Sequence, residues 1–193
     1  MLQRVAVFCA SSNKAGKIFR EAAESVAVFL ARHQIEVYYG GGKDGLMGVL
    51  ANAVIREKGK IIGVQPAFMK AQGWFHPGIS ELILVNTMAE RKEYFFRMAE
   101  AVIALPGGCG TLDELLEAIT LKQLGLFNHS VVILNTADFF NPLLNQLEKM
   151  IAEHFIRDEH RKIWQVIHDP SELPEALNSG NDWSPEHIRL AQI

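Results

Sequence analysis

The sequence predicts a three-layer α/β fold, a doubly wound parallel sheet of about seven strands with helices on both faces. Three observations lead to this prediction. Short apolar segments alternate along the chain with segments whose apolar residues recur at helical spacing. The short segments are apolar throughout, which is typical of strands that helices cover on both sides. Hydrophobic residues make up 49% of the 193 residues, enough to build one substantial core.

The expected strands are short runs rich in Val, Ile, Leu and aromatic residues. They cover residues 4–9, 35–39, 60–64, 81–86, 101–105, 131–134 and 164–167. The expected helices alternate with them, and each has one apolar face. They cover residues 18–30, 46–54, 87–98, 112–124, 142–155 and 171–177. Segment 67–80 reads as a loop or lid. Because the chain has no linker or repeat, we expect one domain over residues 1–180 and a C-terminal tail over 181–193.

Unusual residues follow four of these strands at the point where each strand ends. Ser11 and Ser12 follow the first strand, the glycine-rich residues 40–45 the second, Arg91 the fourth, and residues 106–114 the fifth. Parallel strands place their carboxyl ends at one edge of the sheet. In the common Rossmann-like strand order 3-2-1-4-5-6, a ligand binds at this edge, where the first strand neighbours the fourth. We therefore expect a nucleotide-binding site there.

Residues 106–114, Pro-Gly-Gly-Cys-Gly-Thr-Leu-Asp-Glu, join the fifth strand to the next helix. Their three glycines let a ligand approach the backbone, and the N–H groups at the helix start attract anions, phosphate above all. Glu114 is unexpected here because a phosphate would repel its carboxylate. Thr111-x-x-Glu114 also matches a capping box, in which Glu114 would bond only to the N–H of the capping residue. Glu114 therefore either caps the helix or faces a different part of the ligand.

The second glycine-rich loop, residues 40–45, formally matches the dinucleotide-binding pattern G-x-G-x-x-G. That pattern usually follows the first strand and needs an acidic residue about 20 positions later. Here it follows the second strand, the third strand ends at Gln65, and Glu57 lies too early. Lys43 does not form a P-loop, because no Ser or Thr follows it. Dinucleotide binding is disfavoured, which leaves a tight turn or a backbone cradle for another nucleotide.

The helix after the fourth strand begins with a second capping-box pattern, Thr87-x-x-Glu90, for which a structural role is the better interpretation. Arg91 and Lys92 follow in the first turn. A cation opposes the helix dipole at this end, which favours a functional role for Arg91 and, more weakly, for Lys92.

Composition and charge exclude several classes of function. A net charge of −3 gives no reason to expect nucleic acid or an acidic membrane as a partner. No apolar run approaches the roughly 18 residues of a membrane span, and no signal peptide is apparent. Cys9 and Cys109 are too few for a disulfide framework, and the histidines lack metal-ligand spacing. We expect a cytoplasmic protein without a metal or another cofactor, and we interpret Cys109 as a small loop residue.

The combined motifs resemble the LONELY GUY (LOG) family of cytokinin riboside 5′-monophosphate phosphoribohydrolases, long mislabelled as lysine decarboxylases. The resemblance extends to about residue 156. The matching motifs are Phe8-Cys9-Ala10-Ser11-Ser12, Tyr39-Gly40-Gly41-Gly42, Gly45-Leu46-Met47-Gly48, Met88-x-Glu90-Arg91-Lys92, Pro106-Gly107-Gly108-x-Gly110-Thr111-x-x-Glu114 and Gln123-Leu124-Gly125. The chain departs from the family at Ala10, where glycine is frequent, at Ala89, where histidine is usual, and at Leu121, where tryptophan is common. The last two departures bear on the base pocket.

The resemblance implies hydrolysis of the N-glycosidic bond of a cytokinin riboside 5′-monophosphate, and also of AMP, by a homodimer. The family's catalytic pair corresponds to Arg91 and Glu114. The substrate-binding residues that we expect are Ser11, Ser12, Gly41, Gly42, Met88, Lys92, Gly107, Gly108, Gly110 and Thr111. In this hypothesis Glu114 faces the ribose, while backbone N–H groups hold the phosphate.

Three other functions are possible for such a chain. A nucleotide- or cofactor-binding module without catalysis has the same fold, but it has little use for a carboxylate in an anion site. A lysine decarboxylase needs pyridoxal phosphate on a Schiff-base lysine, and neither Lys43 nor Lys92 lies in a suitable context. An NAD-linked oxidoreductase is disfavoured because the acidic residue for the ribose is missing.

Overall fold

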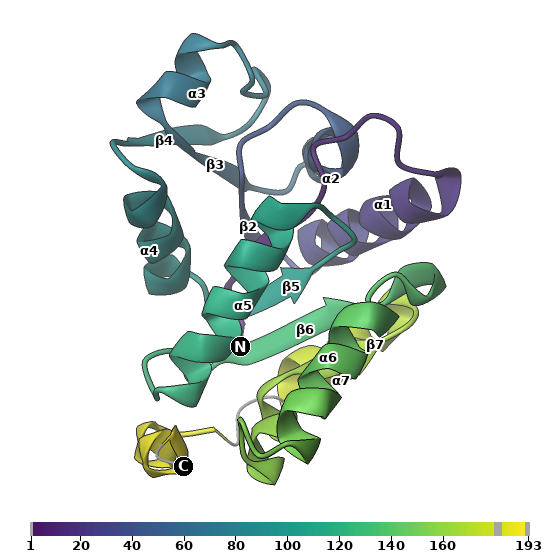
Figure 1. The fold of residues 1–193 in the computed structure, drawn as a ribbon. Helices are drawn as coiled ribbons and strands as arrows, with labels where there is room; N and C mark the ends of the chain where they lie inside the picture. Colours follow the sequence, from purple (N-terminus) through teal and green to yellow (C-terminus); the bar gives the residue numbers. More distant parts are fainter. Residues whose placement is uncertain (1, 180–182, 192–193) are drawn as a thin grey trace.

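The computed structural model describes residues 2–179 and 183–191. Seven parallel strands form one sheet in the order β4-β3-β2-β1-β5-β6-β7 (Figure 1). The strands are β1 (Arg4–Phe8), β2 (Glu36–Tyr39), β3 (Ile61–Pro66), β4 (Glu81–Val85), β5 (Ala101–Ala104), β6 (Ser130–Leu134) and β7 (Gln165–Ile167). This confirms the predicted parallel α/β fold.

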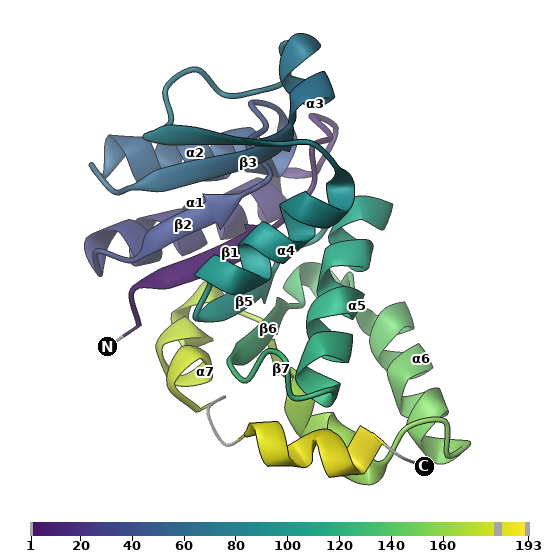
Figure 2. The same ribbon diagram turned by 90° about the vertical axis from the view of Figure 1, so that its left-hand side faces the viewer.

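Helices cover both faces of the sheet (Figure 2). The α-helices are α1 (Lys17–Arg32), α2 (Gly45–Arg56), α3 (Ala67–Ala71), α4 (Met88–Met98), α5 (Cys109–Gln123), α6 (Asn141–Ala152) and α7 (Leu173–Ser179). Short 3₁₀ helices are η1 (Thr136–Asp138), η2 (Asp158–Ile163), η3 (Pro170–Glu172) and η5 (Pro185–Ala191). None of the helices within the described ranges is long and apolar enough to span a membrane.

The core has two halves, one on each side of the sheet. One half joins α1, α2 and α7 to the sheet, and the other joins α4, α5 and α6 to it. Along β1, Val5 and Val7 belong to the first half, whereas Ala6 and Phe8 belong to the second. Side chains alternate between the two faces of a strand, so a strand covered on both sides must be apolar at every position.

The strand order differs from the common order in one respect. The fourth strand of the chain was expected beside the first, but β5 occupies that place and β4 lies at the edge of the sheet. The exposure of the two strands agrees with these positions. All four residues of β5 are buried, whereas Glu81 and Leu84 of β4 are exposed, as an edge strand allows. The switch point, where the order of the strands along the sheet reverses, therefore lies between β1 and β5.

Two other segments differ from the sequence-based expectation. The expected loop over residues 67–80 begins with α3, and α5 begins at Cys109, three residues earlier than expected. In the tail, Trp183 packs into the core, and its indole N–H donates a hydrogen bond to the carbonyl oxygen of Lys122 over 2.6 Å. The expected boundary between residues 180 and 181 lies outside the described residues.

Candidate active site

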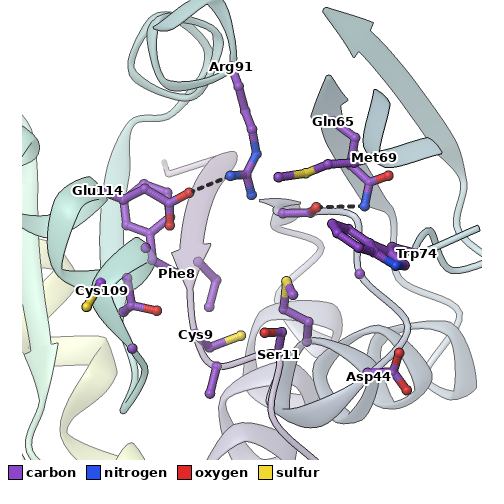
Figure 3. Close-up of a pocket in the computed structure, with 18 of the residues that line it drawn as sticks. Phe8, Cys9, Ser11, Asp44, Gln65, Met69, Trp74, Arg91, Cys109 and Glu114 are labelled. Carbon is purple, nitrogen blue, oxygen red and sulfur yellow. Dashed lines mark hydrogen bonds and ion pairs between the residues drawn. The ribbon is translucent and has the colours of Figure 1, made fainter. Parts of the chain in front are cut away.

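A cavity of about 570 Å³ opens at the carboxyl ends of the central strands (Figure 3). Residues from the loops after β1, β2 and β5 line it, together with the end of β3 and the first turn of α4. Since α1 and α5 lie on opposite faces of the sheet, the loops after β1 and β5 diverge and leave a crevice between them. The cavity lies at the edge of the sheet where the sequence predicts the site.

The start of α5 is open to an anion. Gly108 is the N-cap, so the N–H groups of the next residues have no partner within the helix and carry the positive end of its dipole. A Cβ atom added to Gly108 or Gly110 would meet nothing within 4 Å. At Gly107, by contrast, a Cβ atom would lie 2.1 Å from Thr111 Oγ1. Gly107 is therefore required by packing, whereas Gly108 and Gly110 leave room for a ligand.

The start of α2 is already occupied by the protein itself. The N–H of Gly45 donates to Asn13 Oδ1 over 2.7 Å, and the N–H of Met47 donates to the carbonyl oxygen of Ala10 over 3.2 Å. Gly45 has a φ of +61°, and a Cβ atom there would lie 2.4 Å from the carbonyl carbon of Ser11. The start of α2 is thus a tight turn that packs against the loop after β1, while Gly40, Gly42, Lys43 and Asp44 of the same glycine-rich loop line the cavity.

Arg91 and Glu114 form a buried ion pair, with 3.2 Å between Arg91 NH1 and Glu114 Oε1. They are only 8% and 6% exposed, and both line the cavity. Arg91 is held by its Nε, which donates to the carbonyl oxygen of Val64 over 2.9 Å, and by stacking on the Phe95 ring. Gly40 makes this possible, since a Cβ atom there would lie 2.5 Å from Arg91 NH2.

Burial has the largest effect on the pKa of the Glu114 carboxyl group. Loss of hydration raises the pKa of its carboxyl to about 7, although the Arg91 guanidinium acts in the opposite direction. Glu114 does not form a capping box, because Thr111 is already inside α5 as its third residue. Glu114 therefore projects into the cavity (Figure 3) as a carboxyl that gains and loses its proton near neutral pH.

Capping does explain the start of α4. Thr87 is the N-cap, and its hydroxyl accepts a hydrogen bond from the N–H of Glu90 over 3.0 Å. The Glu90 carboxylate accepts one from the N–H of Asn86 over 2.7 Å. Glu90 thus has the structural role that its sequence pattern predicts, and it fixes the turn that carries Arg91.

The cavity brings together most of the expected site residues. Those that line it are Ser11, Gly42, Met88, Arg91, Gly108, Gly110, Thr111 and Glu114. Four expected binding residues, Ser12, Gly41, Lys92 and Gly107, are not part of the lining. Ala89 and Leu121, the two departures from the family that were expected to bear on the base pocket, do not line it either.

Each of the four residues outside the lining has a structural partner. Gly41 has a φ of +76°, and a Cβ atom there would lie 2.9 Å from the Gln65 side chain. The Ser12 hydroxyl accepts a hydrogen bond from the N–H of Lys14. Lys92 forms ion pairs with two α5 carboxylates, at 3.0 Å from Asp113 and 2.5 Å from Glu117. Lys92 therefore joins the two helices that carry Arg91 and Glu114.

Sequence reasoning missed several lining residues. They are Val7, Phe8, Cys9, Ala10, Gly40, Lys43, Asp44, Met47, Gln65, Met69, Trp74 and Cys109. Most of them belong to the first strand, to the glycine-rich loop 40–45 or to the other motifs that the sequence did single out, so membership of those segments was the available signal. Met69 and Trp74 lie in segment 67–80, which was expected to be a loop or lid without any residue that stood out as part of a site. Burial raises the pKa of the Cys9 thiol, so this thiol stays protonated.

The cavity does not resemble a metal or Schiff-base site. Within residues 2–179 and 183–191, no three His, Cys, Asp or Glu side chains are grouped so as to hold a metal ion. The Lys43 ammonium is exposed and donates a hydrogen bond to the carbonyl oxygen of Gly73 over 2.7 Å. Lys92 is engaged by two carboxylates. Neither amine has the desolvated, unpaired environment that a Schiff-base lysine needs.

Comparison with known proteins identifies the family. A family profile described as "Possible lysine decarboxylase" matches residues 47–177. The probable cytokinin riboside 5′-monophosphate phosphoribohydrolase LOGL2 of Oryza sativa subsp. japonica is 40% identical over 188 residues, which are 97% of this chain and 76% of that protein. The cytokinin riboside 5′-monophosphate phosphoribohydrolase of Rhodococcoides fascians is 39% identical over 176 residues, 91% of this chain and 89% of that one.

Solved structures share the fold at low sequence identity. A molybdenum cofactor binding protein from Rippkaea orientalis matches 93% of this chain and 97% of its own with a TM-score of 0.70 at 18% identity. The molybdenum cofactor carrier protein of Chlamydomonas reinhardtii matches 93% of this chain and 98% of its own with a TM-score of 0.71 at 17% identity. At these identities the likeness concerns the fold alone. The sequence matches, in contrast, cover nearly the whole chain, and the chain belongs to the family of cytokinin riboside 5′-monophosphate phosphoribohydrolases.

Proposed function

We propose that this protein hydrolyses the N-glycosidic bond of a nucleoside 5′-monophosphate and releases the free base and ribose 5-phosphate. The observation that carries the proposal is the Arg91–Glu114 pair, which lines a cavity whose floor includes an open helix start. A site that only bound an anion would gain nothing from a buried carboxyl at this position. The family relatives are named for the same reaction on cytokinin riboside 5′-monophosphates.

The phosphate binds at the start of α5. Backbone N–H groups of Gly108, Gly110 and Thr111 supply donors, and the helix dipole favours the negative charge. Gly108 and Gly110 present no side chain that would keep a phosphate away from these donors. Glu114 lies one turn further along the helix, so it faces the sugar instead of the phosphate.

Glu114 acts on the sugar carbon C1′. Cleavage of the C1′–N bond builds positive charge on the ribose, which a nearby carboxylate stabilises more in the transition state than in the ground state. The same carboxylate can take a proton from the water that attacks C1′. A pKa of about 7 suits this role, because a general base works best when its pKa lies near the working pH.

Arg91 complements Glu114. Its guanidinium is fixed by Val64 and Phe95 before any ligand arrives, and it lies beside the carboxylate. From there it steadies the ligand or donates a hydrogen bond to the departing base and offsets its charge. Both roles require the guanidinium fork and not merely a positive charge.

The substrates that we propose are cytokinin riboside 5′-monophosphates, as in the relatives, and AMP, which has the same phosphate, ribose and purine. The working compartment is the cytoplasm, a proposal supported by two free thiols, of which Cys109 is exposed.

The active form that we propose is a homodimer. Support comes from large apolar side chains exposed along β4, α4, α5 and the turn after α5, namely Leu84, Met88, Leu116, Leu124 and Leu126. Light scattering at micromolar concentration should give twice the mass of one chain, and a monomer at that concentration would contradict the dimer.

Release of adenine from AMP tests the proposed reaction. Glu114→Gln and Arg91→Ala should each fold and lose about 10²–10⁴-fold in turnover, the usual contribution of a positioned acid or base. Thr120→Ala and Arg97→Ala are controls on the same helices, since both side chains are exposed and lie outside the cavity lining. Near-normal turnover in either test variant would remove that residue from the mechanism. Tight AMP binding without adenine release by the unaltered protein would indicate a nucleotide-binding module instead.

A further inference from the structure

Trp74 is an exposed indole on the wall of the active-site cavity. It lies between α3 and β4 and is 51% exposed, whereas Trp164 and Trp183 are buried in the core. An exposed tryptophan that faces solvent alone leaves a large apolar surface in water. Here the ring borders a cavity, so a flat ligand could cover it.

The segment that carries Trp74 is fastened to the glycine-rich loop after β2. The N–H of Lys43 donates to the carbonyl oxygen of Trp74 over 3.1 Å, and the N–H of His76 donates to that of Gly41 over 2.9 Å. Gly42 and Phe75 form an antiparallel bridge between these two bonds. The Lys43 ammonium adds a bond to Gly73. These bonds hold the backbone of the segment against the loop, so Trp74 stays at the wall of the cavity before a ligand arrives, which lowers the entropic cost of binding.

The position of the indole matches one part of a mononucleotide. Figure 3 shows Trp74 and Gln65 on one side of the cavity, across from Glu114 and Cys109. If the phosphate binds at the start of α5 and C1′ faces Glu114, the base extends toward the remaining wall. Trp74 and Met69 on this wall offer an aromatic face and a polarisable thioether, which are surfaces that stack on heteroaromatic rings.

We infer that Trp74 is the residue that recognises the base, with its indole stacked on the nucleobase of the bound mononucleotide. The inference rests on the proposed function for the placement of the phosphate and C1′. In this inference the Trp74 side chain makes the site prefer a nucleotide over a sugar phosphate that has no base. Stacking tolerates different bases because every base has a π face, so Trp74 selects for a base without selecting among purines.

Tryptophan fluorescence tests this inference in the Glu114→Gln background, where AMP binds without turnover. AMP should quench the emission, and Trp74→Phe should abolish the quenching while it keeps the affinity within about threefold, because phenylalanine also stacks. Trp74→Ala should weaken AMP binding about 5- to 150-fold, the usual effect of removing a stacking partner. Ribose 5-phosphate has no base, so its affinity, measured by calorimetry, should be the same in all variants.

Phe68→Ala is the matched control. Phe68 lies in α3, is 54% exposed like Trp74, and does not line the cavity, so its loss should leave AMP affinity unchanged. Undiminished quenching in Trp74→Phe would overturn the inference. So would equal weakening of AMP and ribose 5-phosphate in Trp74→Ala, or the absence of AMP binding. If AMP quenches Trp74 but the unaltered protein releases no adenine, the hydrolase proposal fails and the base-binding role stands.

Discussion

Replacement of Glu114 by glutamine should stabilise the folded protein at neutral and alkaline pH, although it lowers turnover by about 10²–10⁴-fold. Burial raises the pKa of this carboxyl from its ordinary value of 4.5 to about 7. At about 1.36 kcal/mol per pH unit, the difference corresponds to about 3 kcal/mol. Because the pKa is higher in the folded state than in the unfolded state, the contribution of Glu114 to stability is complete below pH 4.5. It decreases as the pH rises and is lost above pH 7.

Glutamine keeps the shape of the side chain and an oxygen that can accept from Arg91, but it carries no charge. The free energy of unfolding of Glu114→Gln should therefore equal that of the unaltered protein near pH 4 and exceed it by about 2–3 kcal/mol at pH 8. Urea unfolding followed by circular dichroism measures both values. Asp113→Asn, an exposed carboxylate next to Glu114 in sequence, should change stability by less than about 1 kcal/mol at either pH. A Glu114→Gln variant that is less stable than the unaltered protein at pH 8 would refute the reasoning, because it would mean that the ion pair outweighs the loss of hydration.

Three further predictions concern activity and the glycines. The rate of adenine release should fall as the pH decreases through about 7, since Glu114 must be ionised to act as a base; a profile that stays flat from pH 8 to pH 5 would exclude that role. Gly107→Ala should lower the free energy of unfolding by about 1–3 kcal/mol, because the new methyl group would clash with Thr111. Gly108→Ala should change the free energy of unfolding by less than about 1 kcal/mol and should raise the KM for AMP. Gly40→Ala should displace the Arg91 guanidinium and lower kcat at least about tenfold. In an Arg91→Ala background the same substitution should cause no further loss of kcat. Equal losses in both backgrounds would show that Gly40 does not act through Arg91.

The fold and the location of the site could be predicted from the sequence because both depend on local patterns. The fully apolar β5 and the glycine motif after it identify a parallel strand followed by an anion-binding helix start. Strand order depends instead on competition among strands for the covered centre of the sheet. β4 occupies the edge although it has only one charged residue, as do the central strands β1 and β2, so nothing in the local pattern shows this.

Contacts between distant segments account for what the sequence could not predict. Lys92 and Arg91 are neighbours in the first turn of α4, yet one binds carboxylates outside the cavity and the other enters the cavity. The difference depends on how α4 packs against α5, and the spacing of residues in the sequence does not predict that packing. Trp74 reaches the wall of the cavity only because residues 73–76 bond to the loop after β2. Thr111 fits a capping box in sequence, but the helix starts earlier, at Cys109.

The internal bonds at the start of α2 limit which ligands the molecule can accept. In dinucleotide-binding proteins, a glycine-rich turn with this spacing binds the pyrophosphate of the ligand. In this chain the N–H groups of Gly45 and Met47 are engaged by Asn13 and Ala10, so two donors in the first turn of α2 are not available to an anion. The start of α2 should therefore hold the second phosphate of a dinucleotide only weakly. NAD should therefore compete with AMP far more weakly than ribose 5-phosphate does, although the sequence carries the spacing of a dinucleotide fingerprint.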